Sequence, residues 1–167
     1  LPVTVTTTAG FRSWNLAANS SDIVTRNTQW SFDNFGEDLI ACRRSGRIYL
    51  WDQDITSDPP RAALVTASPS ENNFILVSPN DRHLISFGSN EFSSSIFNPL
   101  LVRWSDQNNI NNFTPSVSST SGENVISDGT EVRGAVRSRN AINVWTDNSL
   151  WTMTFVGPPF IFKFQQM

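Results

Sequence analysis

Short apolar runs separated by turn-forming residues make up most of the chain. Apolar side chains alternate within these runs, so that Ile48 and Leu50 fall on one face of a segment while Tyr49 and Trp51 fall on the other. The best helical window, residues 15–25, lacks a sustained apolar stripe. The pattern therefore predicts an all-β protein.

Three of the apolar runs end at a tryptophan that is followed within two residues by an aspartate. They are GRIYLWDQD (46–54), LLVRWSDQN (100–108) and AINVWTDNS (141–149). We expect each tryptophan to pack into a core and each aspartate to bind the backbone amides of the following turn. The structural repeat positions are Trp51 and Asp52, Trp104 and Asp106, and Trp145 and Asp147.

A second short apolar stretch precedes each of these runs, at residues 38–42, 83–88 and 131–136. Turn formers separate the two members of each pair, which predicts three antiparallel hairpins. The tryptophans recur at roughly the 40–50-residue period of a four-stranded propeller blade. We predict a single all-β domain over residues 1–167, built of antiparallel meander repeats that resemble β-propeller blades in a partial propeller. Unrelated hairpins in a sandwich are the alternative.

Two stretches and the tail complete this outline. Residues 53–62 and 108–122 are predicted loops; the second is either a surface loop with a buried Phe113 or an arm that orders against a neighbouring subunit. In LWTMTFV, residues 150–156, alternate apolar side chains share one face. After a Gly-Pro-Pro break, Phe160, Phe162 and Phe164 are expected on one side of a last strand.

Composition narrows the class of partner. The 167 residues have a net charge of -3, so the chain as a whole has no electrostatic attraction for nucleic acid or an anionic membrane. No apolar run is long enough to span a bilayer, and a soluble protein is expected. One cysteine and one histidine allow neither an internal disulfide nor a Cys/His metal site. The chain begins at Leu1, so it is either processed or a piece of a longer product.

The sequence contains few residues in arrangements typical of catalysis. We therefore predict that the protein is not an enzyme and that it binds no metal and no cofactor. No phosphate loop, dinucleotide-binding or nucleophile-elbow motif is present. His83 is expected to be structural, and Cys42 to be a buried small apolar residue, although neighbouring arginines could activate it. Asp52, Asp106 and Asp147 would converge only in a symmetric channel, and turn capping is their expected role.

Arginines are the most distinctive charged residues, since eleven of the twelve cations are Arg. They cluster at the first and third predicted hairpins, and we expect both clusters on the same rim. They are candidates for a subunit interface or a DNA-facing surface; the alternative is that they pair with acids of adjacent units. The candidates are Arg43, Arg44, Arg47, Arg133, Arg137 and Arg139.

Four motifs in this order are similar to virion structural proteins of tailed bacteriophages, of the tail hub and nozzle kind. They are W-x-x-D-N-x-G-E-D at 30–38, V-S-P-x-x-R-H-L at 77–84, R-W-S-D-Q at 103–107 and V-W-T-D-x-x-L-W-x-M-x-F-V-G-P-P-F at 144–160. The resemblance covers residues 30–164. It implies a propeller-like component repeated around the tail axis, which helps to form the channel through which DNA leaves. The resemblance implies no catalytic residues in this chain.

The resemblance also implies partners and a location. They are copies of the chain and neighbouring tail proteins, with transient contact to phage DNA, in a virion tail made in the host cytoplasm. The rival interpretation is a carbohydrate- or receptor-binding propeller, in which exposed Trp14 or Trp30 stacks on sugars. A glycoside hydrolase ranks third, because it would need paired carboxylates at defined separations.

Overall fold

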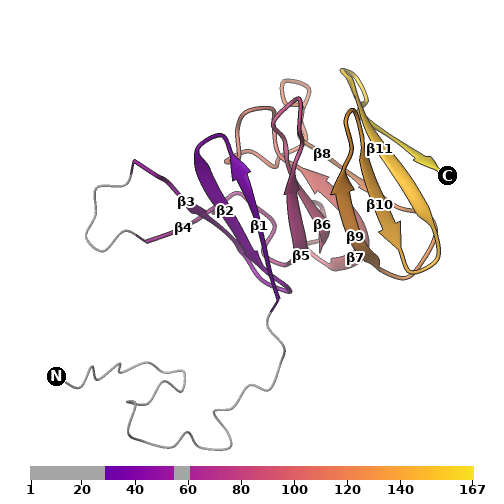
Figure 1. The fold of residues 1–167 in the computed structure, drawn as a ribbon, viewed down its shortest axis with the longest axis horizontal. Coiled ribbons are helices and arrows are strands. Elements are labelled where there is room, and N and C mark those ends of the chain that lie inside the picture. Colours follow the sequence, from indigo (N-terminus) through magenta and orange to yellow (C-terminus); the bar gives the residue numbers. More distant parts are fainter. Residues whose placement is uncertain (1–28, 55–60) are drawn as a thin grey trace, which may run out of the picture.

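The computed structural model describes residues 29–54 and 61–167, which form three four-stranded antiparallel sheets (Figure 1). Each sheet is a meander whose strands follow one another along the chain. Sheet 1 contains β1 (Trp30–Phe35), β2 (Asp38–Arg43), β3 (Ile48–Trp51) and β4 (Ala63–Leu64). Sheet 2 contains β5 (Asn72–Val77), β6 (Leu84–Asn90), β7 (Phe97–Trp104) and β8 (Gly122–Val125). Sheet 3 contains β9 (Val132–Arg137), β10 (Ile142–Thr146), β11 (Leu150–Gly157) and β12 (Ile161–Gln166).

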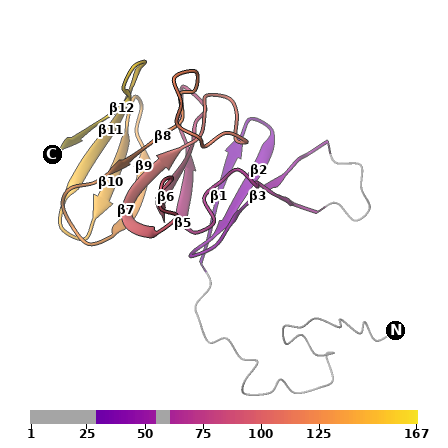
Figure 2. The ribbon, with the colours of Figure 1, turned by 180° about the vertical axis from the view of Figure 1, so that it is seen from behind.

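Sheet 2 lies between the other two sheets, and Figure 2 shows the same order from behind. Alternation along β5 explains how one sheet serves two cores, because Ile75 and Val77 face sheet 1 while Leu76 faces sheet 3. The core between sheets 1 and 2 includes Ile40 and Cys42. The core between sheets 2 and 3 consists of Leu76, Ile85, Phe87, Val102, Trp104, Ile126, Val132, Ile142, Val144, Met153, Ile161 and Phe162.

The first strands of the three sheets lie side by side and run in the same direction. The amide of Ile75 donates to Ser31 Oγ over 3.1 Å, and the amide of Val77 donates to Asp33 Oδ2 over 2.6 Å. Because both residue numbers increase together, β1 and β5 are parallel. On the other side of β5, Asn73 Nδ2 donates to Glu131 Oε1 over 3.3 Å, and Arg137 Nη1 donates to the Val77 carbonyl over 3.4 Å.

Sheets 1 and 3 also reach each other directly, although sheet 2 lies between them. Arg137 Nη2 is 3.0 Å from Asp33 Oδ1, and Arg44 pairs with Glu131. Two flat layers separated by a third layer could not make such contacts, since stacked sheets lie roughly 10 Å apart. The three sheets therefore meet along β1, β5 and β9. Within the described residues they do not close into a ring.

The loop between β7 and β8 packs against its own chain. Ile110 and Phe113 are buried in the core between sheets 1 and 2, which confirms the burial predicted for Phe113. The Asp106 carboxylate accepts hydrogen bonds from the amides of Gln107 and Thr120, and the Trp104 indole donates to the Thr120 carbonyl over 2.9 Å. This loop is held by its aromatic side chain and by backbone hydrogen bonds, while most of its other residues are exposed.

All three predicted hairpins are present, as β2–β3, β6–β7 and β9–β10, and the described residues contain no helix. The window at 15–25 lies outside the described residues. One tail position differs from expectation: Phe162 and Phe164 face the core, but Phe160 is exposed in the turn between β11 and β12. The register of that pair shifts between Phe155 and Gly157, so β12 begins only at Ile161.

Candidate functional site

The turn between β2 and β3 presents three arginines at one end of sheet 1. Ser45 adopts a positive φ of 55° in this turn, and the amide of Arg44 donates to the Gln29 carbonyl over 2.9 Å. Arg44 then reaches Glu131, which precedes β9, while Arg133 Nη1 lies 2.8 Å from the other oxygen of the same carboxylate. Two guanidinium groups on one carboxylate leave this cluster of three side chains with a net positive charge.

Trp30, the first residue of β1, lies between two cavities at this end. One cavity of about 460 Å³ is lined by Trp30, Arg43, Ser45, Gly46, Arg47, Tyr49 and Ser70. A second cavity of about 250 Å³ is lined by Gln29, Trp30, Ser31, Arg44, Asn73, Phe74 and Arg133. We use the name arginine rim for Arg43, Arg44, Arg47 and Arg133 around Trp30.

The arginine rim combines two kinds of recognition group. Guanidinium forks bind carboxylates and phosphates, and an exposed indole offers a face for stacking. Arg43 and Arg47 make no ion pair within the part of the chain that the structure describes. The rim can therefore accept an acidic partner at these two positions without breaking an ion pair to any of the described residues.

Arg137 and Arg139 lie at the other end of the strands, which corrects the expectation that both clusters share one rim. The cause is the order of strands within the sheets. The hairpin of Arg43 and Arg47 joins the second and third strands of sheet 1, whereas the hairpin of Arg137 and Arg139 joins the first and second strands of sheet 3. Arg133, near the start of β9, is the member of the third cluster that joins the rim.

The tryptophans of the sequence repeat show the same offset. Trp51 and Trp104 end third strands, but Trp145 lies on β10, a second strand. Trp104 is buried in the core between sheets 2 and 3, while Trp51 and Trp145 are partly exposed on the outer faces of sheets 1 and 3. The expectation that each tryptophan packs into a core is therefore confirmed for Trp104 and wrong for Trp51 and Trp145.

The aspartates that follow these tryptophans bind turn backbone. Asp52 Oδ1 accepts from the amide of Asp54 over 2.8 Å, and Asp147 Oδ1 accepts from the amide of Thr130 over 2.7 Å. Hydrogen bonds from the side chain and amide of Thr130 lower the pKa of Asp147 to about 2. The pKa of Asp106 is also lowered, because hydrogen bonds to its charged form outweigh the opposing effect of burial. Asp52 and Asp106 thus bind amides of the turn that follows them, as the sequence predicts. The prediction is wrong for Asp147, which caps the segment before β9 instead.

On the side away from sheet 2, sheet 1 has a face that no other described sheet covers. Trp30, Phe32 and Trp51 are on this face with exposed fractions of 48%, 59% and 37%. The register places Leu39, Ala41, Tyr49 and Leu64 on the same face. We call this set the aromatic face. Its three largest side chains expose about 300 Å² in total, on the basis of the surface that such side chains can bury. A patch of this size is comparable to the largest found on monomeric proteins.

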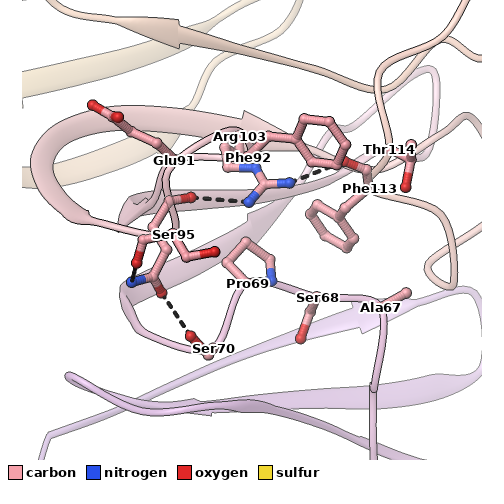
Figure 3. Close-up of a pocket in the computed structure, with 11 residues that line it drawn as sticks. Ala67, Ser68, Pro69, Ser70, Glu91, Phe92, Ser95, Arg103, Phe113 and Thr114 are labelled. Carbon is pink, nitrogen blue, oxygen red and sulfur yellow. Dashed lines mark hydrogen bonds between the residues drawn. The ribbon is translucent and has the colours of Figure 1, made fainter.

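A third cavity of about 260 Å³ lies beside Arg103, lined by the β4–β5 and β6–β7 connections and the loop after β7 (Figure 3). Arg103 is buried and donates to the carbonyls of Asn90 and Phe113 over 2.9 and 3.0 Å. It ties the β6–β7 connection to the loop after β7. Its Nε is 3.5 Å from Glu123 Oε2, and Phe92 covers the guanidinium. We interpret Arg103 as a structural clamp, since its donors serve the protein's own backbone.

Neither sequence candidate for catalysis is placed for it. Cys42 is buried, and burial raises the pKa of its thiol to about 12, so the adjacent arginines do not activate it. His83 is fully buried, with Nδ1 2.7 Å from the Ser105 carbonyl and Nε2 3.6 Å from Asp81 Oδ2. Ser78 donates to the other oxygen of Asp81, and His83 Nε2 has no hydrogen-bond partner among the described residues.

Sequence reasoning missed three residues of this region. Glu131 and Asp33 hold the arginines of sheet 3 and the β2–β3 turn in place, yet no local pattern around either acid marks it. Trp30 was singled out only for sugar binding. Their roles depend on contacts between segments that are about one hundred residues apart.

No helix in the described part of the chain is long and apolar enough to cross a membrane. Among the same residues, no group of three or more potential ligands could hold a metal ion. Comparison with protein-family models, with curated proteins and with solved structures finds no match for this chain.

Proposed function

We propose that the chain is a structural component of a tailed-bacteriophage virion, of the tail hub or nozzle kind. In this proposal it assembles into a ring that forms part of the DNA-ejection channel. The observation that carries the proposal is the meeting of three consecutive four-stranded meanders along their first strands. Propeller blades have this arrangement. The four sequence motifs described above are the basis for proposing a role in the virion.

The described residues form three sheets, and typical propellers have four to eight blades. No other described sheet covers the outer faces of sheets 1 and 3. On sheet 1 this face is aromatic and continues into the arginine rim. We propose that these surfaces contact neighbouring copies or other tail proteins in the virion, which would remove the apolar patch from water. The arginines that remain accessible, Arg43 and Arg47 first among them, are the groups available for transient contact with DNA phosphates.

Electron microscopy of the purified chain tests this proposal. We expect ring-shaped particles with a central opening. The double variant Arg43→Ser/Arg47→Ser should assemble less, because it removes charge from the rim without breaking an ion pair among the described residues. Arg139→Ser, an exposed residue at the other end of the strands, is the matched control and should assemble normally. Particles without a ring at any concentration would overturn the proposal.

The second candidate function is a carbohydrate- or receptor-binding module. The cavity lined by Trp30 and Tyr49 beside two arginines favours it, since aromatic faces stack on sugar rings and guanidinium groups bind their hydroxyls and carboxylates. A glycan array separates the two functions. Specific binding that Trp30→Ala abolishes, by a chain that does not self-associate, would establish the module in place of the scaffold. Trp14, the other tryptophan proposed for sugars, lies outside the described residues.

A further inference from the structure

We propose that the cavity beside Arg103 binds one ring of a neutral saccharide. This binding site goes beyond the proposed scaffold function, because none of the residues that line it belongs to the arginine rim or to the aromatic face. Three features of the cavity carry the proposal. They are the unused donors of a buried guanidinium, the hydroxyl groups and aromatic ring beside it, and the balance of charge around it.

The guanidinium of Arg103 is buried in the wall of the cavity and has donors that the described residues do not use. Nη1 donates one N–H to the Asn90 carbonyl and Nη2 donates one to the Phe113 carbonyl, as Figure 3 shows. Each Nη carries a second N–H, which has no acceptor among the described residues. Nε lies 3.5 Å from Glu123 Oε2 without a hydrogen bond. Because an unpaired buried donor is costly, a ligand that supplies oxygen acceptors is favoured here.

Hydroxyl groups border the same cavity. Ser95 in the β6–β7 connection and Thr114 in the loop after β7 are exposed, and neither hydroxyl has a hydrogen-bond partner in the described part of the chain. Figure 3 shows these two residues on opposite sides of the Arg103 guanidinium. Ser70 donates to Asn90 Oδ1 over 3.0 Å, and its oxygen can still accept. A sugar hydroxyl both donates and accepts, so this mixture of groups matches it.

An aromatic ring lies beside these polar groups. Phe92 is 47% exposed, and Arg103 Cζ lies 5.7 Å from the centroid of its ring. The Phe92 amide donates to Glu123 Oε2 over 2.9 Å, which holds the residue next to the guanidinium. Buried Pro69 adds a second apolar part to the lining. A sugar ring can pack its C–H face on such a surface while its hydroxyls reach the polar groups.

Charge and volume define the class of ligand. Glu123 pairs with Arg103 and so already balances its charge. Glu91 adds a second carboxylate to the lining, and hydrogen bonds from Ser94 and Asn98 lower its pKa, which keeps it ionised at neutral pH. The cavity therefore has no positive charge left for an anionic ligand, and a neutral ligand is favoured. Its volume of about 260 Å³ is slightly below the roughly 300–1,000 Å³ of typical ligand pockets, which suits a single sugar ring.

Saturation-transfer NMR on the full chain tests the proposal. The probes are the methyl glycosides of glucose, galactose, mannose and N-acetylglucosamine, with methyl glucuronide as the acidic counterpart. We expect transfer from the protein to at least one neutral glycoside, with a Kd in the millimolar range that is usual for a ligand of about a dozen non-hydrogen atoms. No transfer to any probe would mean that the cavity holds only water, and it would overturn the proposal. So would tighter binding of the glucuronide than of every neutral glycoside.

Variants that keep the fold assign the binding to this cavity. Ser95→Gly and Thr114→Val each remove one hydroxyl and no hydrogen bond among the described residues; Ser95 has a φ of 57°, which glycine adopts without strain. Each variant should bind about two- to tenfold more weakly and unfold in urea no earlier than the wild type. Phe92→Ala should weaken binding by a similar factor. Phe160→Ala is the matched control, because it removes an exposed ring from a turn outside the cavity, and it should bind like the wild type.

Trp30→Ala separates this cavity from the one at the arginine rim. Ser70 lines both cavities, so the two are neighbours. Binding that is kept in Trp30→Ala and weakened in Phe92→Ala would support the proposal. Binding that Trp30→Ala abolishes, and that Phe92→Ala and Ser95→Gly leave unchanged, would favour the second candidate function and overturn this inference. The proposed assembly is measured separately, by the mass of the particle in solution.

Discussion

Replacing Asp33 by alanine should destabilise the protein by about 1–4 kcal/mol. The Asp33 carboxylate is buried on β1, accepts from the amide of Val77 over 2.6 Å, and lies 3.0 Å from Arg137 Nη2. It thus joins all three sheets. Removing it leaves a buried amide without a partner, which costs about 1–3 kcal/mol. Loss of the ion pair adds no more than about 1 kcal/mol, because Arg137 is half exposed.

Two further substitutions separate these contributions. Asp33→Asn keeps an oxygen for the Val77 amide and loses the ion pair, so we expect a loss of about 1 kcal/mol. Asn34→Ala, at the exposed neighbouring position, should change stability by less than about 0.5 kcal/mol. Urea unfolding followed by tryptophan fluorescence measures all three. If Asp33→Ala lost no more than Asn34→Ala, the account of sheets meeting along their first strands would be refuted.

Three other predictions concern the core, a turn and the thiol. Phe113→Ala should cost about 3–5 kcal/mol in urea unfolding, because the ring is buried between sheets 1 and 2, whereas Val117→Ala in the same loop should be neutral. The lowered pKa of Asp147 stabilises the fold above the unfolded value of 3.8, and this stabilisation is lost as the pH falls toward about 2. Asp147→Asn should therefore flatten the acid limb of a stability-against-pH curve; an unchanged limb would contradict the capping role. Cys42 should react with a maleimide at pH 8 only after unfolding, as measured by mass spectrometry, and rapid labelling of the native protein would show that sheet 1 is not packed as described.

Hairpins were the most predictable part of the fold. Each predicted pair of apolar runs is an antiparallel pair, because alternation and turn formers are local signals. The place of a hairpin within its sheet is not a local property. The Trp-Asp motif occurs after a third strand at Trp51 and on a second strand at Trp145. Because of this offset, the prediction made from the sequence repeat placed Arg137 at the wrong end of the molecule.

The candidate site was predictable in its residue types and not in its partners. Clustering identifies Arg43, Arg44 and Arg47, and the structure adds Arg133 to them. Glu131 is 87 residues from Arg44 along the chain, and a single sequence contains no signal for such a contact. The exposure of the aromatic face could not be predicted from the sequence either. The alternation in β3 indicates two apolar faces, but it does not indicate which of them stays exposed among the described residues.

Light scattering of the purified chain over a range of protein concentrations, at low and high salt, tests the central claim of assembly most directly. The account predicts a defined particle heavier than the 18.7 kDa of one chain, which weakens as salt screens the contacts of the arginine rim. A mass of 18.7 kDa at every concentration and at both salt conditions would contradict it.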